Sequence, residues 1–268
     1  MSTQKIHPSA IVESGARLGE GVRIGPYCIV GPQVELGDGV ELISHAVVTG
    51  NTRVGARTRI FPFASIGHEP QDLKFHGETN SLVIGVDCLI REGVTMNPGT
   101  AGDHSETVIG DRCVFLANAH VAHDCVLGNG IIFSNAVMLA GHCKIGDNVI
   151  MGGGAGVHQF CRIGRNAFVG GMAGVESDII PYGTALGNRA YLGGLNLVGM
   201  KRAGVPRESI HNARRAFKEI FRSEGTVQES VAALDPQLRQ DAIVSAIADF
   251  IVDGGDRALC TPRSARDG

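Results

Sequence analysis

An apolar residue returns at every sixth position between Ile109 and Val175. Helices bring side chains to one face about every 3.6 residues and strands about every 2, so neither element explains this spacing. A smaller residue follows each apolar position four places later, as Cys113 follows Ile109. Such hexapeptide repeats are typical of a parallel β-helix. The twelve apolar positions are Ile109, Phe115, Val121, Leu127, Phe133, Leu139, Ile145, Met151, Val157, Ile163, Val169 and Val175.

The same repeat begins at Ile6, runs to Ile66 and resumes at Ile84. Three hexads would form one lap of the coil, and successive laps would stack at the strand spacing of about 4.8 Å. Several glycines directly follow apolar positions, as in Ile24-Gly25 and Val54-Gly55. We expect them at tight corners that need unusual backbone angles. The pattern therefore predicts a mainly β protein built as a rigid, three-sided coil.

Two segments, 68–82 and 101–108, leave the repeat and are candidate site loops. We expect the β-helix to span residues 1–188 with these two excursions, and a small C-terminal helical domain to span 189–268. The helical spacing starts at about Tyr191, and one apolar stripe follows Pro206. Thr226 and Glu229 form a capping-box pattern, and a further helix is expected around Leu238–Ile251. The last dozen residues look frayed.

Composition narrows the class of protein. The net charge of −3 gives no footprint for nucleic-acid binding. No apolar tract is long enough to cross a membrane and the N-terminus lacks a signal-peptide pattern, so we expect a cytoplasmic protein. Six of the seven cysteines fall on the small inward position of a hexad, which favours reduced core thiols over metal ligands or disulfides. Cys260 is the exception.

Four histidines provide the candidate chemistry. His120, His123, His142 and His158 all avoid the inward first and fifth positions of their hexads, so we expect them outside the core. The hexads of His123, His142 and His158 begin at Val121, Leu139 and Val157, one lap apart, and should stack on one side of the coil. Asp124 adjoins His123, and a histidine beside a carboxylate can act as a general base near neutral pH. A solvated polar stripe and a three-histidine zinc site, as in hydratases built on this repeat, remain alternatives.

A group of positive residues marks the first helical segments. A solvated helix face and a docking surface for an acidic partner fit this charge equally well. The residues are Lys201, Arg202, Arg207, Arg214, Arg215, Lys218 and Arg222.

Several strings in the chain match a known family. Residues 118–125 read NAHVAHDC, 139–142 read LAGH, 157–160 read VHQF and 71–74 read QDLK. Together they closely resemble the acyl-carrier-protein–UDP-N-acetylglucosamine O-acyltransferases of lipid A biosynthesis. The resemblance implies a homotrimer of left-handed β-helices with active sites between subunits. It also implies direct transfer of a 3-hydroxyacyl chain from acyl carrier protein to the sugar 3-hydroxyl, with no metal and no further cofactor.

The resemblance also implies roles for single residues. His123 would remove the proton from the sugar hydroxyl, Asp124 would orient His123, and the Gly141 amide would bind the oxyanion. Gly171 occupies the position that limits acyl length in the family, and a glycine there implies a long chain. The residues implied in sugar-nucleotide binding are Asp72, Lys74, His120, His142, His158 and Gln159, with Asn196 and Arg202 near the phosphates or the donor's pantetheine arm.

Some positions depart from the family pattern. Asn97-Pro98 stands where many members carry a His-Arg pair, and Arg189 and Val198 replace residues that are often polar or imidazole. Some members acylate a 3-amino sugar in place of the 3-hydroxyl. The acceptor atom therefore stays open, and both alternatives share the UDP-sugar and the carrier protein.

Overall fold

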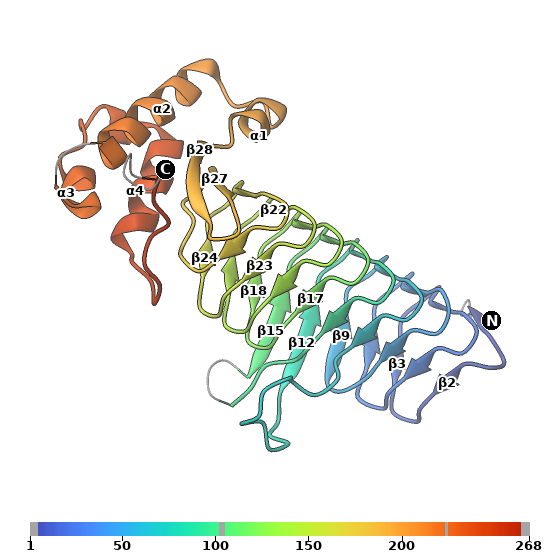
Figure 1. Cartoon of the computed structure of the whole chain (residues 1–268). Coiled ribbons are helices and arrows are strands. Elements are labelled where there is room, and N and C mark those ends of the chain that lie inside the picture. The colour runs from blue at the N-terminus through green and yellow to red at the C-terminus, as the bar shows by residue number, and fades with distance from the viewer. Residues whose placement is uncertain (1–4, 102–104, 223–224, 264–268) are drawn as a thin grey trace.

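The hexads form short strands that wind into a parallel β-helix with three sheets (Figure 1). The computed structural model describes residues 5–101, 105–222 and 225–263. Residues 102–104 of the second expected excursion and 264–268 of the expected frayed end lie outside these ranges. The N-terminal lap forms one end of the coil and the helices gather at the other (Figure 1).

Each side of the coil is one sheet. Sheet A has eleven strands, β1 (Lys5–Ile6), β4 (Arg23–Ile24), β7 (Glu41–Leu42), β10 (Arg59–Ile60), β13 (Leu89–Ile90), β16 (Val114–Phe115), β19 (Ile132–Phe133), β22 (Ile150–Met151), β25 (Phe168–Val169), β27 (Gly183–Leu186) and β28 (Tyr191–Leu195). Sheet B has nine, β2 (Ile11–Val12), β5 (Ile29–Val30), β8 (Val47–Val48), β11 (Ser65–Ile66), β14 (Thr95–Met96), β17 (His120–Val121), β20 (Met138–Leu139), β23 (Gly156–Val157) and β26 (Gly174–Val175). Sheet C has eight, β3 (Arg17–Leu18), β6 (Glu35–Leu36), β9 (Thr52–Val54), β12 (Ser81–Ile84), β15 (Glu106–Ile109), β18 (Val126–Leu127), β21 (Lys144–Ile145) and β24 (Arg162–Ile163).

The register between laps follows the hexads. Val121 pairs with Leu139, and Leu139 with Val157, so each lap contains three hexads as predicted. Across the excursions the pairing continues, with Met96 opposite Val121. The excursions are shorter than predicted, because β12 begins at Ser81 and β15 at Glu106. Both loops therefore leave the coil without disturbing the stack of strands above and below them.

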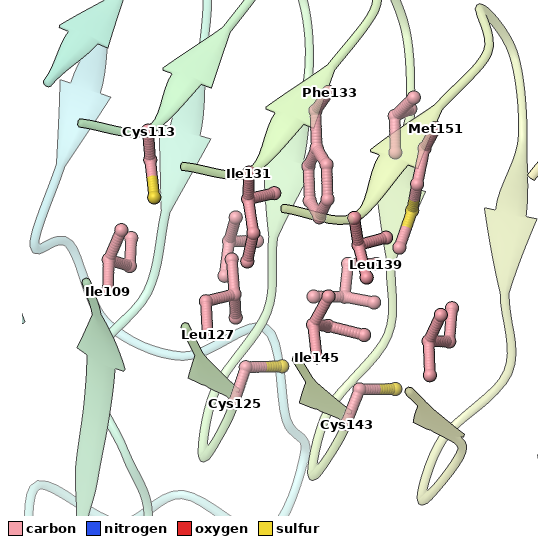
Figure 2. Packing of buried hydrophobic residues seen from close by; sticks show 14 of the residues in the cluster. Ile109, Cys113, Cys125, Leu127, Ile131, Phe133, Leu139, Cys143, Ile145 and Met151 are labelled. Carbon is pink, nitrogen blue, oxygen red and sulfur yellow. The ribbon is translucent and has the colours of Figure 1, made fainter. Parts of the chain in front are cut away.

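The interior of the coil is filled by the two inward residues of each hexad (Figure 2). Phe115 and Phe133 meet edge to face, with ring centroids 5.2 Å apart. The six cysteines on the small inward positions are buried and free, which confirms the prediction of reduced core thiols. They behave as small apolar side chains in a tightly packed column.

The glycines that follow apolar positions serve a different purpose from the one expected. Positive φ angles occur two residues later, at Tyr27 and Arg57, and not at Gly25 or Gly55. A Cβ on Gly25 would collide with the backbone of Ile43 in the next lap. The expectation of unusual backbone angles at these glycines is therefore wrong, and close approach of neighbouring laps is the reason for them.

The C-terminal region contains the helices α1 (Leu197–Arg202), α2 (Arg207–Arg222), α3 (Val227–Ala232) and α4 (Ala242–Val252), with a 3₁₀ turn, η1 (Leu238–Gln240). The capping box of Thr226 and Glu229 at α3 is confirmed. The helical spacing expected from Tyr191 is wrong, because β28 pairs antiparallel with β27 there. Asp241 caps α4 and separates it from η1, so the single helix expected around Leu238–Ile251 is divided.

The segment after α4 is ordered against the coil, contrary to the frayed end expected. Asp178 N–H donates to Ala258 O, and Cys260 N–H donates to Asp178 O, both at 2.8 Å. Leu192 N–H donates to Thr261 O at 2.9 Å. Residues 255–261 form a segment that we call the strap. These bonds to the buried Asp178 and to β28 hold the strap across the last lap of the coil.

Among the described residues, no helix is both long and apolar enough to cross a membrane.

Candidate active site

The candidate site lies at the corner that joins sheet B to sheet C. Three successive laps turn this corner after β17, β20 and β23, so residues one lap apart form columns. One column holds His123, Gly141 and Gln159, because His142 N–H donates to His123 O and Phe160 N–H donates to Gly141 O. The predicted stacking of the histidine hexads on one side of the coil follows from this register.

The His123 ring is fixed by a buried carboxylate. His123 Nδ1 lies 2.8 Å from Asp124 Oδ2, and the two residues are only 6% and 2% exposed. Thr100 donates its backbone N–H to Asp124 Oδ1 at 2.9 Å and its hydroxyl to Oδ2 at 2.6 Å. A carboxylate that accepts these bonds stays an acceptor, so His123 Nδ1 is the donor and Nε2 keeps its lone pair.

Gly141 lies directly against the His123 ring. A Cβ at this position would lie 2.6 Å from His123 Cε1 and 2.8 Å from Nε2, closer than side-chain carbons approach. No described residue accepts a hydrogen bond from the Gly141 N–H. The glycine thus leaves room for the ring, and its amide is a donor without a partner among the described residues.

His142 and Phe160 pack beside the His123 ring. The His142 ring meets His123 edge to face at 4.9 Å and stacks on Phe160 at 4.5 Å. His142 Nδ1 lies 3.9 Å from Asp124 Oδ2. Asp124, His142 and Phe160 share a column whose φ angles of 57°, 62° and 66° turn each corner in the same way. His142 therefore supports the His123 ring from the side.

His120 lies one strand position before the corner. The Thr95 hydroxyl approaches His120 Nδ1 at 2.7 Å. Burial lowers the pKa of His120, and the positive charge that His123 can carry lowers it further. The neutral form of His120 is therefore favoured more than in a solvent-exposed histidine.

A groove of about 660 Å³ runs along sheet B in front of these side chains. His120, His123, Gly141, His158 and Gln159 line it, whereas His142, predicted from the sequence to group with them, does not. Met138, Gly156 and Gly174 form its apolar floor, one lap apart from each other. The sequence interpretation did not single out these three, although their spacing from His120 would have placed them in its column.

The first excursion brings a further side chain to the groove. Gln71 lines it, whereas Asp72 and Lys74 of the same loop do not. The Lys74 N–H donates to Asp72 Oδ1 at 3.0 Å within the loop. Asn97 anchors the start of this loop, because its Nδ2 donates to the carbonyls of His68 and Glu69, both at 3.1 Å.

The remaining residues expected at the site lie on another side of the coil. Asn196 and Arg202 line a cavity of about 850 Å³ between α1 and the strands β22 and β25 of sheet A. The Asn196 side chain caps α1 and donates to Asn166 O at 3.0 Å. Gly171 is exposed at the corner between sheets A and B. One chain alone does not bring these residues to the histidine groove.

Comparison with known proteins identifies the family. Residues 178–260 match the family described as Udp N-acetylglucosamine O-acyltransferase, domain 2, and residues 15–50 match the bacterial transferase hexapeptide family. The chain is 64% identical to the acyl-[acyl-carrier-protein]–UDP-N-acetylglucosamine O-acyltransferase of Methylobacterium radiotolerans, over 98% of this chain and 97% of that protein. The chain belongs to this acyltransferase family.

Solved structures of the acyltransferase family agree with the fold. The UDP-N-acetylglucosamine acyltransferase of Campylobacter jejuni is 37% identical, with a TM-score of 0.90 over 97% of this chain and 100% of that one. The enzyme of Francisella novicida is 31% identical, with a TM-score of 0.93 over 98% of this chain and 96% of that one. A hexapeptide-repeat β-solenoid followed by helices is therefore common to this chain and to these family members.

One cluster in this acyltransferase resembles a metal site. The donor atoms of His123, Asp124 and His142 lie within 4.8 Å of one another. However, Asp124 already binds His123 Nδ1 at 2.8 Å, a bond that an ion between these two side chains would displace. His158, the third histidine of the zinc alternative, is not a member of this cluster. The geometry favours a hydrogen-bonded pair over a three-histidine zinc site.

Proposed function

We propose that this chain transfers a 3-hydroxyacyl group from acyl carrier protein to the 3-position of UDP-N-acetylglucosamine, the first step of lipid A biosynthesis, in the cytoplasm. The relatives carry the acyl-carrier-protein and UDP-sugar substrates in their names. The observation that carries the proposal is the groove in which His123, fixed by Asp124, adjoins the Gly141 amide.

His123 acts as the general base. Its Nε2 accepts the proton of the sugar 3-hydroxyl while that oxygen attacks the thioester carbonyl of the donor. The imidazolium is stabilised by Asp124 and then protonates the departing pantetheine sulfur. Positioned proton transfer of this kind contributes about 100-fold to 10,000-fold in rate. Asp124 does not need to take the proton, because orienting and charge stabilisation are sufficient.

The Gly141 amide stabilises the oxyanion of the tetrahedral intermediate. Its N–H has no acceptor among the described residues, so the donor is available to the reacting carbonyl oxygen. One such donor contributes about 3 to 4 kcal/mol to transition-state stabilisation. Acyl transfer by direct attack then needs no metal, no further cofactor and no covalent enzyme intermediate.

A homotrimer explains the distribution of the binding residues. Groove residues of sheet B and the cavity around Asn196 and Arg202 lie on different sides of one chain. A neighbouring copy in a trimer would bring its cavity toward the groove, so that one UDP-sugar spans both. Asp72, Lys74, His120, His142, His158 and Gln159 are then assigned to the sugar nucleotide. Light scattering of the purified protein tests the trimer, and a monomeric, active protein would refute it.

Gly171 is proposed to leave the acyl groove open for a long chain. A Cβ at Gly171 would lie 3.3 Å from Gly153 O, a tight contact with backbone, and would meet no side chain within 4 Å. A larger residue there would extend into the space beside Gly171. Comparing donors of different length with Gly171→Met would show a shift toward shorter chains if this assignment is right.

The second candidate is the same transfer onto a 3-amino UDP-sugar. Asn97 occupies the place of a family histidine, and its buried Oδ1 has no hydrogen-bond partner among the described residues. Asn97 holds the loop that carries Gln71 into the groove. Asparagine in place of histidine at position 97 therefore affects the part of the groove that selects the acceptor atom. A competition assay with equal concentrations of the hydroxyl and amino UDP-sugars decides between the two acceptors.

The acidic carrier protein is proposed to dock on α2. Arg214 and Lys218 are exposed on this helix, whereas Arg215 is paired with Glu219 at 2.8 Å and with Asp235 at 3.4 Å. Arg214→Glu and Lys218→Glu should therefore raise KM for the acyl carrier protein more than Arg215→Glu does. The increase should be larger at low salt, since salt screens exposed charges.

The central test removes the proposed base. His123→Ala should lower kcat for acyl transfer at least 100-fold with little change in the dissociation constant of the UDP-sugar. His68→Ala changes an exposed histidine in a loop and serves as a matched control. Wild-type turnover by the His123 variant would refute the assigned role.

A further inference from the structure

The strap brings an arginine from the end of the chain to the candidate active site. Arg257 Nη2 lies 2.6 Å from His158 Nδ1, and Arg257 Nε donates to Gln159 O at 2.8 Å. His158 and Gln159 line the groove. One guanidinium thus contacts two neighbouring residues of the site from a position 99 residues away in sequence.

Arg257 occupies the place where a further lap would have been. In the preceding laps, the carbonyls of His123 and Gly141 accept the backbone N–H of the next lap. The corresponding amide for Gln159 would belong to Asp178, which donates instead to Ala258 O of the strap. Arg257 Nε therefore supplies the missing donor and ends this ladder.

The backbone on both sides of Arg257 is fixed. Asp178 bonds to Ala258 and Cys260 on one side of the arginine. On the other side, Gly255 packs against the Asp178–Arg162 ion pair, whose N–O distance is 2.7 Å. A half-buried arginine that is held in this way loses little further freedom when it binds the imidazole.

His158 Nδ1 also lies 3.4 Å from Gln159 O, but the 2.6 Å contact with Arg257 is much shorter and decides which nitrogen carries the proton. A guanidinium has donors only, so Arg257 can bind Nδ1 only if that nitrogen offers its lone pair. The ring proton then resides on Nε2, the nitrogen that remains available to the groove. We propose that Arg257 is a positioning residue that holds His158 as an Nε2–H donor toward an oxygen of the sugar nucleotide. The identity of that substrate rests on the proposed function.

The first experiment observes the tautomer directly. Imidazole ¹⁵N NMR of the ligand-free full chain, with His158 assigned through His158→Gln, should show an unprotonated Nδ1 and a protonated Nε2. Arg257→Met, which keeps the apolar stem and removes the donors, should give a mixture of both tautomers. Arg257→Lys should retain the Nε2–H form in part, because one ammonium can still donate to Nδ1.

A matched control lies just beyond the strap. Arg263 stacks over Tyr191 at 4.2 Å, so Arg263→Met removes an equal charge without touching His158. This variant should keep the wild-type His158 spectrum and the wild-type KM for the UDP-sugar.

The second experiment separates positioning from structural support. Arg257→Met should raise KM for the UDP-sugar about tenfold, equivalent to about 1.4 kcal/mol, with kcat changed less than twofold. An unchanged His158 tautomer in Arg257→Met, or a lower unfolding temperature without any change in KM, would overturn the proposal. If the wild-type chain acylates no UDP-sugar, the proposed function fails, and the NMR comparison still decides the effect of Arg257 on His158.

Discussion

Replacing Gly141 by alanine should displace the His123 ring without straining the backbone. The φ angle of Gly141 is not positive, so alanine can adopt its conformation. The added Cβ would lie 2.6 Å from His123 Cε1, whereas ordinary contacts of a Cβ begin at 3.4 Å. The ring must therefore move by about 0.8 Å, or the lap that carries Gly141 must move away from it.

That movement is large compared with the displacement that the hydrogen bond between His123 and Asp124 can tolerate. The bond from His123 Nδ1 to Asp124 Oδ2 is 2.8 Å long, and a shift of this size along the bond takes it out of hydrogen-bonding range. Misplacement of a reacting group by about 1 Å costs about 100-fold in rate, equivalent to about 2.7 kcal/mol. We therefore expect kcat of Gly141→Ala to fall about 100-fold, with a smaller change in KM for the UDP-sugar.

Steady-state acyl transfer from a carrier-protein donor measures this effect. Gly153→Ala adds a methyl at the equivalent position of another corner, where the nearest atom is Asn135 O at 3.3 Å. The unfolding temperature of Gly153→Ala measures how much an added methyl group alone destabilises a corner of the coil. If Gly141→Ala keeps kcat within twofold of wild type, close contact between Gly141 and a fixed His123 ring is not required for catalysis, and the reasoning fails.

Three further outcomes are expected. Thr100→Val should lower kcat about tenfold and Thr100→Ser should not, because only the valine removes the hydroxyl bond to Asp124 Oδ2; equal activity of the two variants in the same assay would contradict this. Because the folded state lowers the pKa of His120 from 6.5, the unfolded chain binds more protons below that pH, so the free energy of unfolding should fall as the pH drops through and below 6.5. Denaturant titrations at several pH values measure the free energy of unfolding. Its slope against pH should be shallower for His120→Gln than for the wild type, and an identical slope would count against the assigned cause. Burial raises the pKa of Cys161 to about 12 and of Cys260 to about 11, so a thiol reagent should label neither in the native protein at pH 8 and both after denaturation, as mass spectrometry of the labelled chain can determine.

The sequence by itself determined the coil, its lap length and the composition of its core. A six-residue apolar repeat is a local pattern that only a β-helix buries, so the register of Val121, Leu139 and Val157 followed from counting. The same counting grouped His120, His123, His142 and His158 on one side, since each lap returns the chain to the same side; three of them line the groove, whereas His142 packs against the His123 ring. It also led to the reduced thiols of the interior.

Only the tertiary structure decided which groups complete the site. Thr100 reaches Asp124 from the loop between β14 and β15, and Arg257 reaches His158 from a strap that has no repeat and no helical spacing. No periodicity encodes such contacts, because they depend on where irregular segments return to the coil. The antiparallel pairing of β28 with β27 escaped prediction for the same reason. Repetition predicts neighbours one lap apart, whereas contacts between a lap and a non-repeating segment depend on packing of the whole chain.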